Sequence, residues 1–130
     1  MAFELPGFVD GTRPAGADLS SHQYKFVKLN SSGQVVICAA ATDKPYGILQ
    51  NKPTSGQAAE VMKNGLSKMI MAAGNTKGNV GGTDSSGLFA AYAFGTDTTK
   101  YMCAEVVEDA DAASGVGTVA FDCFMPPRGA

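Results

Sequence analysis

Four neighbouring residues near the start of the chain carry the side-chain types of a hydrolytic triad. They are Asp18, Ser20, Ser21 and His22. A working triad needs a serine, a histidine and a carboxylate in a linear relay, and so short a piece of chain does not readily place them in one. An aspartate or serine that caps a turn before a strand explains the same pattern without chemistry. We therefore expect a turn here and no catalytic centre.

The cysteines do not form a recognisable metal-binding or disulfide pattern. The three cysteines are Cys38, Cys103 and Cys123, none of them within a Cys-x-x-Cys pair, and His22 is the only histidine. Structural zinc sites usually take their ligands in close pairs on a turn. We therefore expect buried free thiols, no metal and no cofactor. The odd number of cysteines also favours a reducing compartment.

Two further segments match known binding loops only in part. Residues 74–83 are rich in glycine, but their lysine precedes the later glycines and a strand-like run follows where a phosphate-binding loop opens a helix. Asp109 and Asp111 begin like a calcium loop, but Gly115 comes one residue late and Ala120 stands where the bidentate glutamate belongs. We expect both segments to be surface loops. The chain is therefore predicted not to be an enzyme.

The composition narrows the classes of partner. Ten basic residues stand against twelve acidic ones, which excludes a strong basic field for binding nucleic acid. We see no apolar stretch long enough for a membrane span and no secretion signal at the start. Charged residues make up only 17% of the chain, and there are 16 glycines. Few bulky side chains indicate a thin core, and few charged side chains indicate a surface that contacts another protein.

Short β-prone runs separated by turn residues predict an all-β fold, a small β-sandwich or β-barrel of about seven to nine short strands. The predicted strands cover residues 23–29, 35–40, 45–50, 57–63, 66–71, 88–94, 101–107 and 115–124. Asn64-Gly65 predicts a type I′ hairpin turn, because this pair tolerates positive φ angles best. Residues 74–87, with five glycines, predict a surface loop.

The first residues show neither a helical nor a strand period. The chain divides into an extended N-terminal arm (1–17), a β-rich domain (18–125) and a C-terminal tail (126–130). The apolar side chains of the arm are those of Phe3, Leu5, Phe8 and Val9. Such an arm either packs back on its own domain or lies on a neighbouring molecule, and the sequence leaves both options open.

Methionines gather on one face of the predicted hairpin. Met62, Met69 and Met71 share that face in the register set by the turn. Because methionine side chains are flexible and adaptable, this face is a second predicted contact with another subunit or another partner protein.

The order of several short motifs is more specific than any one of them. An acidic-Leu-Ser turn at residues 17–20 precedes a Y-x-x-V strand at residues 24–27. The segments 45–53 and 56–61 are similar to a "G-V-L-x-x-x-P" and "G-x-x-x-x-V" pair. An "x-G-x-x-K" segment at residues 64–68 and a "D-x-x-G" turn at residues 84–87 follow. In this order the motifs resemble the head decoration, or cement, proteins encoded beside the major capsid genes of tailed bacteriophages.

This resemblance implies a structural virion protein. Such a protein is made in the host cytoplasm, binds the major capsid protein on the outer capsid surface, and stabilises the head by bridging capsid subunits. The resemblance also implies a homotrimer, and it would place the arm on the capsid. The residues alone leave open an alternative, a β-sandwich module that binds glycans on a virion or cell surface. Sugar sites usually use exposed aromatic rings, and this chain has four tyrosines and no tryptophan.

Overall fold

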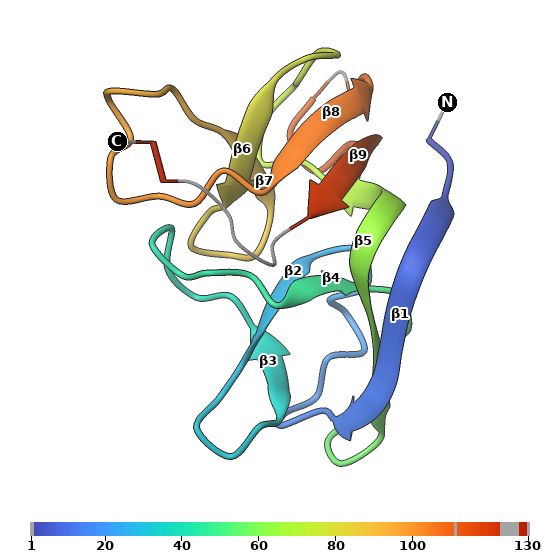
Figure 1. Cartoon of the computed structure of the whole chain (residues 1–130). Helices are drawn as coiled ribbons and strands as arrows, with labels where there is room; N and C mark the ends of the chain where they lie inside the picture. The colour runs from blue at the N-terminus through green and yellow to red at the C-terminus, as the bar shows by residue number, and fades with distance from the viewer. Residues whose placement is uncertain (1, 111, 123–127, 130) are drawn as a thin grey trace.

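The computed structural model describes residues 2–110, 112–122 and 128–129. Within these residues the chain forms nine strands and no helix. The strands are β1 (Leu5–Pro14), β2 (Phe26–Leu29), β3 (Val35–Ile37), β4 (Gly47–Leu49), β5 (Ala58–Ile70), β6 (Val80–Thr83), β7 (Phe89–Ala91), β8 (Ala104–Glu108) and β9 (Val116–Asp122). They form one antiparallel sheet that curls into a half-barrel (Figure 1). The predicted all-β class is confirmed.

The long strand β5 organises the sheet. The strand order is β3-β2-β4-β5-β9-β8-β6-β7, and β1 pairs with β5 outside this path. Met62 in β5 has a partner in β1 and another in β4, and Leu66 has one in β1 and another in β9. A strand has two edges, so β4 and β9 follow one another along one edge of β5 while β1 covers the opposite edge.

The predicted hairpin turn at Asn64-Gly65 is wrong. Both residues lie inside β5, which continues from Ala58 to Ile70. Gly65 does adopt a positive φ of 117°, but Pro6 of β1 and Phe121 of β9 pair with it from the two sides. The glycine lets the strand bend where its partner changes from β4 to β9. Ladder pairing on both edges outweighs the local preference for a turn.

The predicted loop at residues 74–87 contains a strand, β6, that the sequence analysis missed. A Cβ atom at Gly81 would overlap the backbone carbonyl of Ala90 in β7, and one at Gly82 would overlap that of Tyr101. The glycines therefore allow the backbones to approach closely instead of marking a loop. The other predicted runs contain or overlap β2, β3, β4, β7, β8 and β9.

Two clusters of buried side chains lie along the sheet. The larger one contains Phe26, Cys38, Ile48, Met62, Met69, Met71, Phe89, Cys103, Ala104, Val106, Ala110, Val119 and Phe121. The smaller one contains Ala15, Leu19, Val27, Val35, Leu49, Ala59 and Val61. Both clusters therefore contain residues of β2, β4 and β5, which lie at the middle of the fold.

The three methionines correct a prediction. Met62, Met69 and Met71 are fully buried in the larger cluster, so they fill the core and are not available as a contact face. The three methionines do lie together as predicted, and the error concerns the side they face, because this face is turned to the core. Cys38 and Cys103 are buried there as predicted, whereas Cys123 lies outside the described residues.

The predicted N-terminal arm is largely a strand of the same sheet. Residues 5–14 form β1, and their backbone pairs with β5 from Ala58 to Leu66. Ala15 directly after it is buried in the smaller cluster. Of the predicted tail, residues 126–130, only Arg128 and Gly129 are described. The backbone of Arg128 forms an isolated antiparallel β-bridge with that of Tyr101. The arm has therefore packed back on its own domain.

Candidate functional site

Polar side chains fasten β1 to the rest of the molecule. The Tyr46 hydroxyl donates a hydrogen bond to Asp10 Oδ2 at 2.5 Å. Asp10 Oδ1 accepts bonds from the backbone N–H and the hydroxyl of Thr12 at 2.9 and 2.6 Å. Arg13 reaches the carbonyl oxygen of Gly33 at 3.2 Å. These bonds add to the ladder with β5 and fix the middle and the end of the strand.

Tyr46 is the centre of this attachment. Its ring packs against the smaller apolar cluster, and Lys63 Nζ lies 3.6 Å from the ring centroid and 2.6 Å from the Tyr46 carbonyl oxygen. The hydrogen bonds from Thr12 and then from Tyr46 lower the pKa of Asp10 to about 2. Burial, and next the Asp10 carboxylate, raise the pKa of Tyr46. At neutral pH the pair is therefore a hydroxyl donating to a charged carboxylate, which is a strong kind of hydrogen bond.

The residues around the start of β1 are also held by polar contacts. The hydroxyl of the fully buried Thr118 accepts a bond from the Phe3 N–H at 2.7 Å and donates one to the Phe3 carbonyl at 3.1 Å. Asn64 Oδ1 accepts the Phe8 N–H at 2.8 Å. Burial, and next a hydrogen bond with Glu4, raise the pKa of Tyr24 to about 12. The segment is therefore anchored from Phe3 onward.

The apolar side chains of this segment are exposed. The exposed fractions are 41% for Phe3, 68% for Leu5, 53% for Phe8 and 39% for Val9. Their exposed apolar areas sum to about 400 Å². We call these four side chains the β1 surface. On this strand the polar groups hold the fold and the apolar groups meet solvent, which reverses the usual arrangement.

The free edge of β1 is poorly suited to accept another strand. Pro6 and Pro14 lack N–H donors, and the pairing with β5 shifts register at three places along the strand. Prolines and bulges are the features by which proteins block edge-to-edge pairing. The free edge of β1 therefore offers a partner its side chains and not a backbone suited to pairing.

The residues with triad-like side chains form a turn, as predicted. Asp18 Oδ1 accepts the backbone N–H of Ser20 at 3.0 Å, and His22 Nδ1 lies 3.2 Å from Lys25 Nζ. Across the described residues, no group of three His, Cys, Asp or Glu side chains is placed to hold a metal ion.

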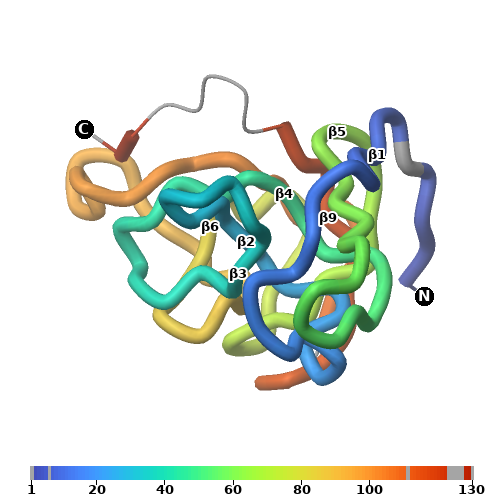
Figure 2. The backbone as a smooth tube through the Cα atoms, turned by 90° about the horizontal axis from the view of Figure 1, so that it is seen from below, coloured from blue at the N-terminus to red at the C-terminus, as the bar shows by residue number. Residues whose placement is uncertain are grey.

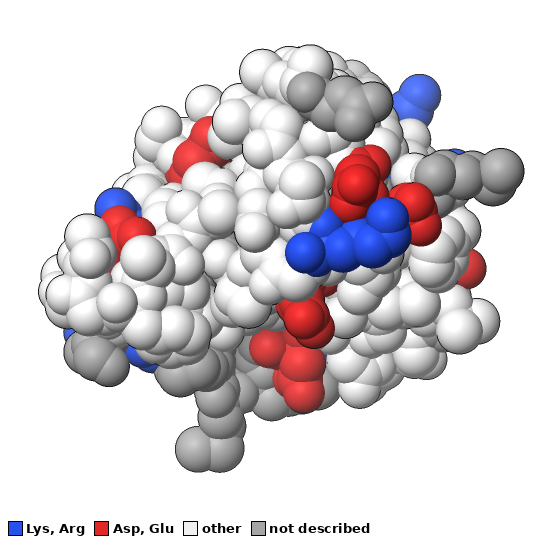
Figure 3. Space-filling view, turned by 90° about the horizontal axis from the view of Figure 1, so that it is seen from above, with Lys and Arg blue, Asp and Glu red and all other residues white. Residues whose placement is uncertain are grey.

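The acidic segment after β8 fastens a neighbouring loop. Asp109 accepts the backbone N–H of Lys77 at 2.8 Å, and Lys77 Nζ lies 3.5 Å from Asp109 and 3.7 Å from Glu108. Asp111 lies outside the described residues. The face in Figure 3 carries small groups in which basic and acidic side chains adjoin, and most of that face is uncharged.

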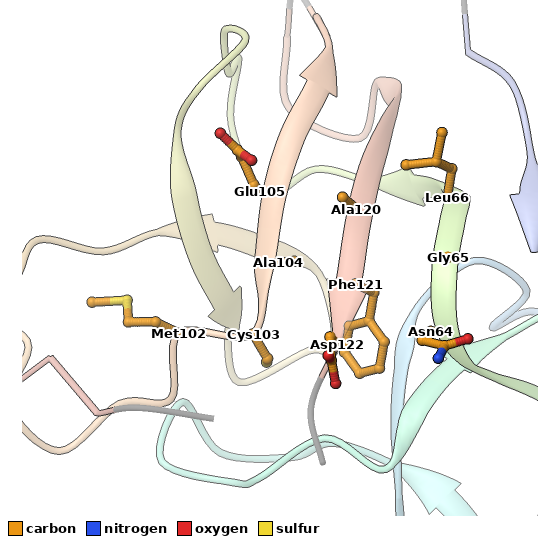
Figure 4. Close-up of a pocket in the computed structure, with 10 residues that line it drawn as sticks. All are labelled: Asn64, Gly65, Leu66, Met102, Cys103, Ala104, Glu105, Ala120, Phe121 and Asp122. Carbon is orange, nitrogen blue, oxygen red and sulfur yellow. The ribbon is translucent and has the colours of Figure 1, made fainter. Parts of the chain in front are cut away.

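One pocket of about 570 Å³ lies across β5, β9 and β8. The lining residues come from neighbouring register positions and from the approach to β8 (Figure 4). They are Asn64, Gly65, Leu66, Met102, Cys103, Ala104, Glu105, Ala120, Phe121 and Asp122. This described lining includes two carboxylates and no histidine, lysine or arginine. The thiol of Cys103 and these two carboxylates are the reactive groups of the described lining, which lacks the histidine that usually activates such a thiol.

The sequence shows the exposed apolar residues but not the residues that hold them. Asp10, Arg13 and Lys63 belong to no motif, because their partners are far away in the chain. Tyr46 contributes to the sequence pattern only as part of a predicted strand. Phe94, which is 61% exposed, was assigned to a strand although Gly95 directly after it is a turn signal.

Comparison with protein-family models and with curated proteins finds no match for this chain. No helix in the described part of the chain has the length and apolar character needed to cross a bilayer. The β1 surface and its polar anchors are therefore the features on which a function must be argued.

Proposed function

We propose that this protein is a decoration protein of a tailed-phage head. It binds the outer surface of the capsid and stabilises the head by bridging major capsid subunits. The observation that carries the proposal is the β1 surface, in which three apolar side chains of the fixed strand β1 and that of Phe3 before it are turned to solvent. Exposing apolar groups to water is unfavourable in free energy, and covering them with a partner protein removes this penalty and favours binding.

The fixed position of β1 favours binding. A flexible arm would lose conformational entropy when it lay down on a capsid, whereas β1 is already ordered by β5, Tyr46 and Thr118. About 400 Å² of apolar area is close to the apolar share of one partner's side in a standard protein interface. The contact is therefore the size of a specific, reversible protein interface.

Repetition on the shell accounts for stabilisation by modest contacts. Each bound copy adds its own binding free energy to the closed shell and none to separated subunits. The homotrimer that the resemblance implies would place three β1 surfaces in one particle and raise its avidity.

The glycan-binding alternative has less support from the tyrosines. The cations beside the rings are Lys68 at Tyr24, Lys63 and Arg13 at Tyr46, Lys100 at Tyr92 and Arg128 at Tyr101. Each tyrosine side chain is partly buried. An exposed ring flanked by planar polar groups, which a sugar would stack on, is missing among these four.

The test is co-sedimentation with undecorated heads assembled from the major capsid protein of the same genome. The wild-type protein is expected to bind at a saturable stoichiometry, and Leu5→Ser and Phe8→Ser are each expected to weaken binding about thirtyfold, or about 2 kcal/mol. Because both side chains are exposed, the free energy of unfolding should change by less than about 0.5 kcal/mol.

The double variant Leu5→Met, Phe8→Leu is the matched control. It alters the same positions but keeps them apolar, so it should bind nearly as the wild type does. If the serine variants fold and still bind heads as tightly as the wild type, the β1 surface is not the capsid contact. If the wild-type protein does not co-sediment with heads but binds glycans on an array, the alternative function holds.

A further inference from the structure

A row of side chains links the β1 surface to the pocket across one face of the sheet. Leu5 of β1 lies opposite Leu66 of β5. Leu66 lies in turn opposite Ala120 of β9, which lies opposite Glu105 of β8. Residues directly opposite one another in antiparallel strands project from the same face of a sheet. Figure 4 shows Leu66, Ala120 and Glu105 side by side, and because all three line the pocket, the pocket continues the β1 surface.

Phe3 is a second link between the β1 surface and the pocket. The Thr118 hydroxyl accepts the Phe3 N–H at 2.7 Å and donates to the Phe3 carbonyl at 3.1 Å. Thr118 lies two residues before Ala120 in β9, so their side chains share one face of the strand. Leu66 and Ala120 are partly exposed on this face. A partner protein that covers Phe3 and Leu5 therefore reaches the edge of the pocket.

The small side chain in the middle of the row leaves space for a group of the partner. Ala120 carries only a methyl group between the larger side chains of Leu66 and Glu105. The pocket has a volume of about 570 Å³, which lies within the range of about 300–1,000 Å³ that ligand pockets have. Leu66 and Met102 give it apolar walls. It is therefore large enough for one long side chain and offers apolar contact to the carbon atoms of that side chain.

The charge of the pocket selects the chemistry of that side chain. Glu105 and Asp122 are exposed carboxylates on neighbouring strands, and the described lining has no basic residue beside them. Within the described residues Glu105 takes part in no ion pair, and the lysines that do, Lys28, Lys77 and Lys100, bind carboxylates outside this lining. An anionic group would be repelled here. A cationic group on an aliphatic stem matches both the carboxylates and the apolar walls.

We infer that the pocket binds a lysine or arginine side chain of the major capsid subunit that covers the β1 surface. The aliphatic stem lies along Leu66 and Ala120, and the cationic end lies at Glu105. This inference rests on the proposed function and adds the chemistry of the partner, which is apolar opposite β1 and basic opposite the pocket. Such an ion pair fixes the orientation in which the domain docks, while the apolar contact supplies most of the affinity.

Glu105→Gln tests the charge, because it removes the carboxylate with little change in shape. In co-sedimentation at about 0.05 M salt the variant should bind undecorated heads about fivefold more weakly than the wild type. At about 0.5 M salt the two proteins should bind nearly equally, since screening weakens the ion pair in the wild type. Glu60→Gln is the matched control. It removes an exposed carboxylate of β5 outside the pocket lining and should bind as the wild type does at both salt concentrations.

Ala120→Leu tests the space. The larger side chain should fill the depression and weaken binding to heads about tenfold at both salt concentrations, because the side chain of the partner no longer fits. Urea unfolding of each variant checks that the domain is folded before binding is compared.

The outcomes separate this inference from the proposed function. The inference is overturned if folded Glu105→Gln binds as the wild type does at low salt, if its deficit is undiminished at high salt, or if Glu60→Gln shows the same deficit. Folded Ala120→Leu that binds as tightly as the wild type also overturns it, because the pocket is then empty in the complex. In each of these cases wild-type binding that depends on Leu5 and Phe8 leaves the proposed function intact. Failure of the wild-type protein to bind heads removes the proposed function and this inference with it.

Discussion

The hydrogen bond between Asp10 and Tyr46 should stabilise the attachment of β1 in a way that can be measured by a double-mutant cycle. Tyr46→Phe removes the hydroxyl but keeps the ring against the smaller cluster and under Lys63. Asp10→Asn removes the charge that accepts the bond and keeps the shape of the side chain. A hydrogen bond to a charged group contributes about 1.5–3 kcal/mol, and partial exposure to water reduces this to about 1 kcal/mol.

The expected coupling energy in the cycle is therefore about 1 kcal/mol. Urea unfolding of the wild type, both single variants and the double variant supplies the four free energies, and the denaturant dependence should stay constant. Hydrogen exchange of the β1 amides should rise in both single variants before exchange in the core strands does. If the two substitutions add within about 0.3 kcal/mol, or if β1 exchanges fast in the wild type, the strand is not held as described.

Three further predictions concern stability. Gly81→Ala should lower the free energy of unfolding by at least about 3 kcal/mol, because the new Cβ would overlap the Ala90 backbone carbonyl; an unchanged thermal midpoint would contradict the described packing of β6 on β7. Asp84→Ala should cost about 1 kcal/mol in urea unfolding, because Asp84 Oδ1 accepts the N–H groups of Ser86 and Leu88 at 2.8 and 2.9 Å; a cost below about 0.3 kcal/mol would count against this turn. The pKa of Asp10, lowered to about 2 first by Thr12 and then by Tyr46, lies below the unfolded value of about 3.9, so its contribution is complete above about pH 4 and is lost as the pH falls towards 2. After allowance for solvent screening this loss is about 1 kcal/mol, and the wild type should lose that much more stability than Asp10→Asn between pH 5 and pH 2.5.

The sequence predicted the strands that have a local signal. Alternation and turn residues identified β2, β4 and β9 within a few residues, because one buried face and flanking turns leave a period of two in the sequence. β1 and β6 left no such signal. β1 is exposed on its apolar side, and β6 contains glycines that permit close backbone approach, so both look like irregular chain.

Of the candidate site, the apolar residues of the β1 surface were predictable from the sequence, but the polar residues that anchor them were not. Phe3, Leu5, Phe8 and Val9 are visible as apolar residues in a segment without a period. Which of them a fold covers depends on pairing with β5, about fifty residues away in the chain. The contact between Asp10 and Tyr46 joins residues 36 positions apart, and no local spacing rule indicates it. The methionines were grouped correctly, but the local pattern does not indicate which face of β5 the rest of the fold covers.

The most direct test of capsid attachment through β1 is a cryo-electron microscopy reconstruction of undecorated heads saturated with the protein. We expect density for the domain on the outer capsid surface, with Leu5 and Phe8 of β1 against a major capsid subunit. A decorated head on which β1 faces solvent, or a head that carries no added density at saturating protein, would contradict this attachment.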